Sequence, residues 1–374
     1  MAKTDHVGAV VVGAGIVGLT SAFHLVERGV GPIVVIEESD SPGQGSSKGS
    51  SRVAGFALTN EVEVRLFRQA HFQDWPQLER RIRQKIRFPC PSVLFGADIG
   101  NFADTVREAG GEFECLTPEA ARAEFPVFSF QNTDEVVLEG HSSLLAADLV
   151  VESLSRWLKV KGVTLALGTR VEALSSVSPV LLETSRGQLS CDHLVLAAGA
   201  HTSQLFPELE QHLFSQRLPV FEFEILSDHG TRLGEDCPIW THFGWEQGLV
   251  YGLPGRGRDG MKIVLCPEGE TELDLPTYGE MIRTFLEGES ALRLGSITDS
   301  HWCTVTYSSS SKFVLANHPE NPKVSIGAGF CGRGFKFAPS LGRRLAELCT
   351  LPVEETSTFL GFPDPFSLEE YQNE

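Results

Sequence analysis

The chain contains no continuous apolar segment that approaches the length of a membrane span, although it has 374 residues. It also has few basic residues relative to acidic ones: 31 Lys and Arg against 49 Asp and Glu give a formal net charge of −18. Because nucleic-acid binding requires clustered positive charge, this balance argues against a nucleic-acid partner. We therefore expect neither a membrane nor a nucleic acid as a partner.

Metal-ligand spacings are absent as well. Eight cysteines are scattered along the chain without a C-x-x-C pair, so we predict no metal site. The first apolar segment lies so close to Met1 that no secretion signal precedes it, which predicts a cytoplasmic protein with reduced thiols. We expect most of these cysteines to be small buried hydrophobic residues.

Near its start the chain has the pattern of a strand, a glycine-rich turn, a helix and a second strand. An apolar segment, residues 9–12, enters the run Gly-Ala-Gly-Ile-Val-Gly at 13–18. A helix-compatible segment follows, and a second apolar segment, residues 33–36, stops at Glu37. This is the G-x-G-x-x-G spacing of a dinucleotide-binding unit, with an acid about twenty residues further on that can accept hydrogen bonds from a ribose.

The residues of this turn have distinct physical roles. Gly13 permits the tight turn, Gly15 lets the backbone approach a pyrophosphate, and Gly18 lets the helix and the strand pack closely. The helix begins at Ile16 and Val17, where free N–H groups and the positive end of the helix dipole would face the phosphates. The pattern predicts a dinucleotide site, but it does not distinguish FAD from NAD.

A polar loop follows the second strand. Residues 39–51 are rich in glycine and serine, and Arg52 closes the segment. The N–H and O–H groups of such a loop suit an anion or the polar edge of a ring, whereas the alternative is a serine linker that faces solvent.

The remaining pattern predicts an α/β fold in which two domains alternate along the chain. Helical periodicity covers 61–86 and 146–161, and a last helix begins near Pro339. Strand patterns cover 88–96, 192–198, 216–226, 248–253 and 261–265. We assign 1–86, 146–215 and 305–374 to a Rossmann-like nucleotide-binding domain, and 87–145 and 216–304 to a substrate domain built on a mixed sheet. Small residues after 192–198, including Gly199, would allow close approach to a cofactor.

Four motifs together resemble a known family. They are GAGIVG with Glu37, GSSKGSSR at 45–52, LVLAAGA at 194–200 and IGAGFCGRGFKFAPSLG at 326–342. The chain resembles the flavin amine oxidases of the D-amino-acid oxidase superfamily, in particular the family of monomeric sarcosine oxidase, N-methyltryptophan oxidase and pipecolate oxidase. The likeness extends from about Val7 to Leu345.

The resemblance implies a monomer with an FAD domain under an eight-stranded mixed sheet and the substrate between them. Members of the family oxidise secondary or cyclic amines, including N-methyl and cyclic amino acids. A hydride passes from the carbon next to nitrogen to flavin N5, the imine hydrolyses, and O2 accepts the electrons to give hydrogen peroxide.

The resemblance also implies roles for particular residues. Cys303 matches the cysteine that holds the flavin 8α-carbon through a thioether, and Lys262 matches the lysine that faces flavin N5 through water and activates O2. Lys336 matches the lysine that meets the substrate carboxylate, or else the flavin C2 carbonyl. Arg52 matches an arginine on the other flavin face, and Tyr251 matches an aromatic wall beside the substrate. The further matched flavin contacts are Ser46, Ser47, Lys48 (a histidine in the family), Ser51, Val171, Gly332, Gly334 and Phe335.

Departures from the family fall on the substrate side. Gly55 stands where the family has an arginine that grips the substrate carboxylate, and Val305 replaces an aromatic residue. Arg333 and Cys266 each replace a histidine. We therefore expect a bulkier amine or imino acid as substrate, with any acidic group met by Lys336 and Arg333.

Two other functions stay open at this point. A flavin-dependent amine dehydrogenase would pass its electrons to an acceptor other than O2, which a lysine at 262 argues against. A non-catalytic flavoprotein is the second alternative, for which Gly55 and Val305 leave room.

Overall fold

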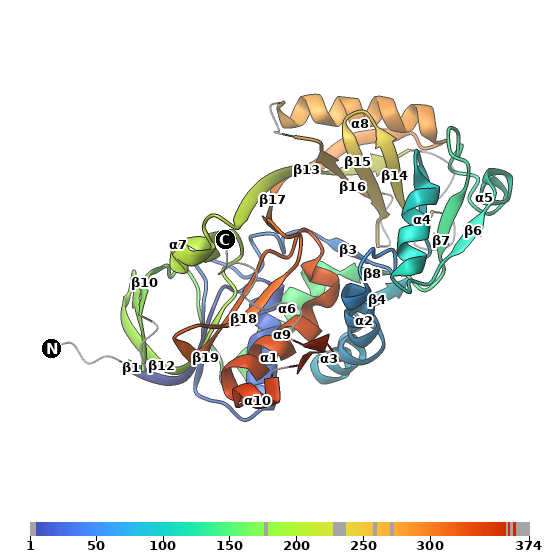
Figure 1. Cartoon of the computed structure of the whole chain (residues 1–374). Coiled ribbons are helices and arrows are strands. Elements are labelled where there is room, and N and C mark those ends of the chain that lie inside the picture. The colour runs from blue at the N-terminus through green and yellow to red at the C-terminus, as the bar shows by residue number, and fades with distance from the viewer. Residues whose placement is uncertain are drawn as a thin grey trace.

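The computed structural model describes residues 5–175, 179–226, 237–256, 260–269, 273–356, 358–359 and 362–363. Within this part of the chain, most strands belong to two eight-stranded sheets in separate lobes (Figure 1). The long strands β13 and β17 belong to the upper lobe and extend toward the lower one. This is the α/β architecture, with a mixed second sheet, that the sequence predicts.

The first sheet is the Rossmann-like layer. Its order is β10-β11-β12-β1-β2-β9, with β19 beside β12 and β18 beside β19. Four of its pairings are parallel, and the middle strand β1 carries four consecutive buried residues at 9–12, as a parallel sheet covered on both faces requires. The strands are β1 (Asp5–Val12), β2 (Ile33–Ile36), β9 (Thr164–Ala166), β10 (Val171–Ser175), β11 (Val180–Thr184), β12 (Gly187–Leu196), β18 (Val314–His318) and β19 (Asn321–Ala328).

Three of the helices in the core of this lobe are α1 (Ile16–Glu27), α6 (Ala147–Val160) and α9 (Gly334–Thr350). Helices α1 and α9 approach closely, because a Cβ on Gly342 would lie 2.5 Å from the Thr20 backbone. Thr20 Oγ1 also donates a hydrogen bond to the Ala338 carbonyl at 2.8 Å. The two helices therefore behave as one packed unit at the N-terminal end of α1.

Helix α9 begins at Gly334, so the prediction of a start near Pro339 is wrong by more than one turn. Proline inside a helix costs one backbone hydrogen bond. Here the carbonyls of this turn receive side-chain donors from elsewhere: Trp75 Nε1 donates to Lys336, and His24 Nε2 donates to Pro339. The carbonyl that loses its helical donor at Pro339 is that of Phe335, so these bonds do not replace the lost one; they join α9 to residues that lie far away in the sequence.

The second sheet has the order β17-β13-β16-β15-β14-β5-β7-β6. The pair β14 and β5 is parallel and the other pairs are antiparallel, so the sheet is mixed. One face packs under α8 (Leu275–Glu289) in a core that includes Phe221, Ile282 and Leu286. The strands are β5 (Ser92–Gly96), β6 (Glu114–Leu116), β7 (Val136–Glu139), β13 (Leu213–Ile225), β14 (Ile239–Trp245), β15 (Gly248–Pro254), β16 (Gly260–Pro267) and β17 (Leu294–Ser308).

Smaller elements connect the lobes. A three-stranded sheet, β3-β8-β4, consists of β3 (Ser51–Ala54), β8 (Ser143–Ala146) and β4 (Arg87–Pro89). The predicted helix at 61–86 is α2 (Glu61–Gln69), a π-helical turn (Ala70–Asp74) and α3 (Trp75–Ile82) in succession. The other helices are α4 (Ile99–Glu108), α5 (Pro118–Glu124), α7 (Thr202–Leu205) and α10 (Val353–Thr356), with 3-10 turns at Gly199–His201 and Pro207–Leu209 and a hairpin of β20 (Thr358–Phe359) and β21 (Phe362–Pro363).

The two large sheets take their strands from alternating stretches of the chain, as interleaved domains would. The residue boundaries of the two domains stay a prediction. Over the ranges given above, no helix has both the length and the apolarity needed to cross a membrane.

The buried imidazole of His24 predicts a pH-dependent stability. Burial, and next the positive charge of Arg343, lowers the pKa of His24 from 6.5 to about 3. Below pH 6.5 the unfolded chain therefore binds a proton that the folded chain refuses, and stability falls as the pH falls. We expect His24 to account for a loss of about 2 kcal/mol between pH 7 and pH 5. Urea unfolding of the wild type and of His24→Gln at both pH values measures it, with His201→Gln, an exposed site, as the control. An equal pH dependence in wild type and His24→Gln would contradict this assignment.

Candidate functional site

The turn after β1 is built so that only glycine fits at its key positions. Gly13 has a φ of +102°, and a Cβ there would lie 2.4 Å from the Ala197 carbonyl oxygen. A Cβ on Gly18 would lie 1.9 Å from the Gly13 carbonyl oxygen. A Cβ on Gly15 would contact only the Ser47 hydroxyl, at 3.3 Å. The packing of the fold therefore does not require a glycine here, whereas the missing side chain leaves room for a ligand. The turn therefore matches the roles that the glycine spacing predicts.

Glu37 closes this turn from the end of β2. One carboxylate oxygen accepts the Ala14 N–H at 2.8 Å, and the other accepts the Ser39 N–H at 3.0 Å. Ile16, the first residue of α1, donates its N–H to the Ser47 hydroxyl at 2.9 Å, and Val17 follows it, buried. The acid, the helix N-terminus and the serine loop thus meet at one place, at the carboxyl ends of β1 and β2, where nucleotides bind in such folds.

The loop at 45–52 is a connected structure and not a loose linker. Ser46 donates its hydroxyl hydrogen to the Thr304 carbonyl on β17, and Ser50 donates to Glu222 Oε1 on β13 at 2.8 Å. Arg52 donates to three carbonyls of its own segment, those of Ser46, Ser51 and Lys48. The loop therefore joins the first lobe to two strands of the second.

Lys262 lies on β16 and points into the space between the lobes. Its side chain is 6% exposed, and Nζ donates to the Ser51 carbonyl at 3.1 Å, an oxygen that also accepts from Arg52 Nη1 at 2.7 Å. Burial, and next the Arg52 guanidinium, lowers the pKa of Lys262 to about 7. A surface lysine would show neither feature, so the inward orientation predicted from the strand pattern is confirmed.

Next to these cations, the second sheet presents an apolar wall. Leu218, Val220, Val264 and Val305 form a buried cluster against which Tyr251, Cys266, Cys303 and Tyr307 pack. Cys303 is half-buried on β17, opposite Leu218 of β13, and its sulfur interacts electrostatically with both Arg52 and Lys262. Burial raises the pKa of Tyr251 and raises that of Cys266 to about 12, so both side chains stay neutral.

The first turn of α9 carries the next group of predicted residues. The Arg52 guanidinium lies 5.3 Å from the centre of the Phe335 ring, a cation–π distance. Lys336 follows, half-buried, and burial lowers the pKa of its ammonium while the nearby Glu139 carboxylate opposes that shift. Gly334 is buried at the start of the helix, and the exposed Gly332 has a φ of +70°.

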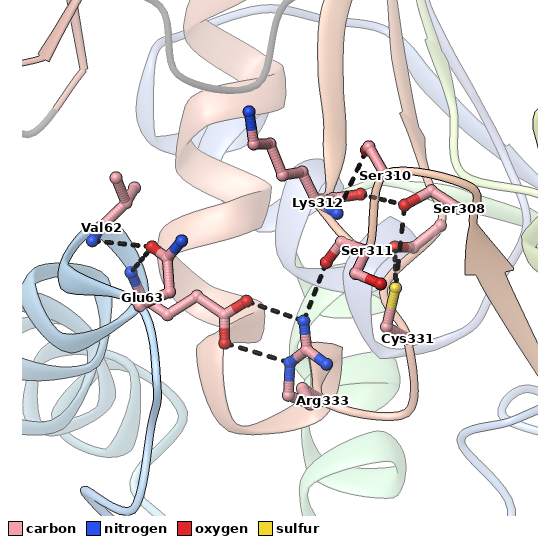
Figure 2. Close-up of polar contacts among 10 residues, drawn as sticks. Val62, Glu63, Ser308, Ser310, Ser311, Lys312, Cys331 and Arg333 are labelled. Atoms are coloured by element: carbon pink, nitrogen blue, oxygen red, sulfur yellow. Dashed lines mark hydrogen bonds and ion pairs between the residues drawn. The ribbon is translucent and has the colours of Figure 1, made fainter. Parts of the chain in front are cut away.

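Arg333 does not face a free substrate carboxylate. Figure 2 shows its guanidinium held by both carboxylate oxygens of Glu63, at 2.8 and 3.0 Å, with a further bond to the Ser311 carbonyl. Glu63 lies on α2, where only 9% of its side chain is exposed. The sequence predicts that Arg333 meets an acidic group of the substrate, whereas in the structure its guanidinium is engaged by Glu63 of the protein itself.

The remaining predicted cofactor residues are Lys48, Val171 and Gly199. Lys48 has an exposed side chain and contributes its carbonyl to Arg52. Val171 starts β10, and Gly199, with a φ of +58°, follows β12. Glu63, Glu139 and Glu222 are not predicted from the sequence, because each reaches its partner from a different element. The one available hint is that Glu139 ends an otherwise apolar strand, residues 136–139.

Comparison with known proteins decides the family. Residues 9–348 match the family described as FAD dependent oxidoreductase. The chain belongs to this family. Among curated proteins, it is 26% identical over 368 residues to peroxisomal sarcosine oxidase of Mus musculus, with 93% of each chain covered. It is 25% identical over 348 residues to N-methyl-L-tryptophan oxidase of Yersinia pestis, with 89% of this chain and 92% of the relative covered.

Solved structures support the fold. A variant of NikD, described as an unusual amino acid oxidase essential for nikkomycin biosynthesis, aligns in its open form with a TM-score of 0.81. The alignment covers 94% of this chain and 97% of that chain at 20% identity. The likeness at this identity concerns the fold alone.

As a member of this family, the chain uses FAD, and its residues fit that cofactor. The glycine turn leaves a backbone cradle at the N-terminus of α1, which suits a pyrophosphate, and Glu37 adjoins it. Between the lobes, Lys262, Arg52 and the Cys303 sulfur adjoin one another. The site can therefore hold an anionic nucleotide at one end and an electron-accepting ring at the other.

Substitution of two glycines, one in the first turn of α1 and one in the serine-rich loop, tests the cofactor cradle. Gly18→Ala should lose bound FAD and destabilise the fold by about 1–3 kcal/mol, because its Cβ would overlap the Gly13 carbonyl. Gly45→Ala is the matched control, since no heavy atom lies within 4 Å of its Cβ position. The flavin absorbance of purified protein and its thermal unfolding measure both effects. Normal flavin content in Gly18→Ala would show that the turn is placed wrongly.

Proposed function

We propose that this protein is an FAD-dependent oxidase of a secondary or cyclic amine, or of an N-substituted amino acid, with O2 as electron acceptor and hydrogen peroxide as product. The curated relatives support the reaction class, because their names describe oxidases of sarcosine and of N-methyl-L-tryptophan. Bound FAD would accept a hydride from the carbon next to the amine nitrogen. The residues of this chain would bind and orient the cofactor and the substrate, and would supply positive charge beside the cofactor ring.

The buried Lys262 carries the proposal. Its ammonium would lie beside the cofactor ring, held by the Ser51 carbonyl, with little access to water. A fixed cation in a dry site stabilises the negative charge that develops on O2 as it accepts an electron. The protein has no need to bury a lysine for its fold alone, since removing an ammonium from water is costly.

The other predicted site residues would bind and orient the cofactor and the substrate. The N–H groups at Ile16 and Val17 would face the pyrophosphate, Glu37 the ribose and Val171 the adenine. Gly199 and Gly332 would leave room for the cofactor, while Ser46, Ser47, Lys48 and Ser51 would contact it through hydroxyls and backbone. Arg52 with Phe335 would bound the ring on one side, and Tyr251 would form a wall beside the substrate. Lys336 would lie at the far end of the substrate space.

The variant Lys262→Met separates the two half-reactions, which are the oxidation of the amine by the cofactor and the reoxidation of the cofactor by O2. Anaerobic bleaching of the yellow colour by amine should stay within about twofold of wild type, whereas the return of colour on mixing with O2 should slow by roughly 10²-fold. In wild type that return should also slow as the pH rises above about 7, where Lys262 loses its proton. Stopped-flow absorbance measures both steps, and Lys159→Met, at an exposed site, is the control.

A panel of secondary and cyclic amines, read by peroxide release, completes this test. Bleaching without reaction with O2, but with reaction toward an artificial quinone, would establish the dehydrogenase alternative. Failure of every amine to bleach the protein would favour the non-catalytic flavoprotein.

A covalent link between the cofactor and Cys303 is part of the proposal. Cys303 lies on β17 within electrostatic range of Arg52 and Lys262, the two cations that would border the cofactor ring. Ser46 anchors the loop to the carbonyl of the next residue on β17, so that the sulfur stays close to Arg52.

Acid precipitation tests the link. Yellow colour should stay with the polypeptide in wild type and in Cys266→Ala, a control from the same apolar cluster. It should pass into the supernatant for Cys303→Ala, because no other bond would hold the flavin once the fold is lost. Colour retained by Cys303→Ala would place the attachment at another residue.

The compartment and the oligomeric state stay predictions. We propose a monomer in the cytoplasm, although the mouse relative is named as peroxisomal. Size-exclusion chromatography and cell fractionation test the two statements separately.

A further inference from the structure

The Glu139 carboxylate occupies the space that a side chain at position 55 would need. Gly55 follows β3 directly, and a Cβ built on it would lie 2.5 Å from Glu139 Oε2 and 3.0 Å from Oε1. A side chain at position 55 therefore requires Glu139 to move. The resemblance places an arginine at position 55. In this chain the Glu139 carboxylate lies against the Gly55 backbone and occupies the space that the arginine side chain would take.

The Glu139 carboxylate is firmly held. It ends β7 with 2% exposure and accepts hydrogen bonds from the N–H groups of Ala57 and Phe56 and from the Ser92 side chain. Burial raises the pKa of Glu139, and Lys336 is the main positive charge that opposes the shift. In return, Glu139 is the main negative charge acting on Lys336, whose pKa burial lowers. The Glu139 carboxylate and the Lys336 ammonium therefore offset one another's charge.

Arg333, the other cation at this end, also has an acceptor within the protein. Both carboxylate oxygens of Glu63 engage its guanidinium. A bidentate grip on a carboxylate requires a guanidinium with free N–H groups, which a lysine does not reproduce. A substrate carboxylate in this space would meet a neutralised lysine and a second carboxylate.

We propose that Glu139 sets the substrate class of this enzyme: a secondary or cyclic amine that carries no carboxylate on the carbon next to nitrogen. The inference rests on the proposed function and narrows it. Burying a carboxylate without a free cationic partner is costly, and the neighbouring Glu139 adds repulsion. An apolar substituent instead meets the wall formed by Leu218, Val305 and Tyr251.

Matched pairs of compounds test this with the wild-type holoenzyme. We compare pyrrolidine with proline, piperidine with pipecolate, and N-methyltryptamine with N-methyltryptophan, by anaerobic bleaching at equal concentration. Each amine should bleach the cofactor faster than its carboxylated partner, by roughly tenfold or more. The pairs differ in the carboxylate alone, so ring size and bulk cancel within each pair.

Glu139→Gln assigns the preference to this residue. Removing the negative charge leaves Lys336 unneutralised, so the ratio of amine to carboxylated partner should fall by roughly tenfold. Lys336→Met added to Glu139→Gln should restore the preference for the amine. Glu289→Gln, a partly buried glutamate next to Ser129, is the control and should leave the ratio unchanged.

Ligand binding gives a second readout that does not depend on turnover. Acetate and 2-furoate should leave the thermal unfolding of wild-type holoenzyme unchanged and should raise the midpoint of Glu139→Gln by a few degrees. If that variant does not fold, the wild-type comparisons decide alone.

The outcomes separate the two proposals. Faster bleaching by the carboxylated partners, or stabilisation of wild type by acetate, overturns the role of Glu139 and leaves the amine oxidase standing. Bleaching by no compound of either class overturns the proposed function itself, and the substrate class with it.

Discussion

The site depends on one backbone oxygen, the Ser51 carbonyl, which accepts hydrogen bonds from both Lys262 and Arg52. Two cations repel one another, and they remain adjacent in a buried place only because an acceptor lies between them. Gly49 completes the arrangement with a φ of +115°, since a Cβ there would lie 3.2 Å from Lys262 Nζ and 3.3 Å from Arg52 Nη1. The conformation of the loop at 45–52 therefore determines whether the two cations can lie next to one another.

The serines of the same loop extend this constraint to both lobes. Ser47 accepts from the first turn of α1, Ser46 donates to β17, and Ser50 donates to Glu222 on β13. Each hydroxyl reaches a different element, so a shift of the loop would move the nucleotide cradle, Cys303 and Lys262 together. A polar segment that reads as a possible linker is in this way the joint between the two sheets.

The features that could be predicted from the sequence are those determined by residues close together in the chain. The roles of Gly13 and Gly18 follow from a turn whose strand, helix and acid lie within one continuous segment, and the inward face of Lys262 follows from strand alternation. The predicted start of α9 is wrong because Pro339 lies inside the helix and not at its first turn, where side chains from the distant α1 and α3 donate to the carbonyls around it. Glu63 and Glu139 were missed for the same reason, since their partners Arg333 and Lys336 come from a distant segment.

These missed glutamates determine where the site keeps its charge. On the substrate side, Arg333 is paired with Glu63, and the Glu139 carboxylate offsets the charge of Lys336 electrostatically. On the Lys262 side, Glu222 is engaged by Ser50, and a carbonyl is the acceptor for the ammonium. A carbonyl stabilises a cation without cancelling its charge, whereas a carboxylate cancels it. Lys262 and Arg52, held by carbonyls, thus keep their positive charge on the face where O2 would gain electrons, whereas carboxylates offset Arg333 and Lys336 at the opposite end, where an uncharged substituent would lie.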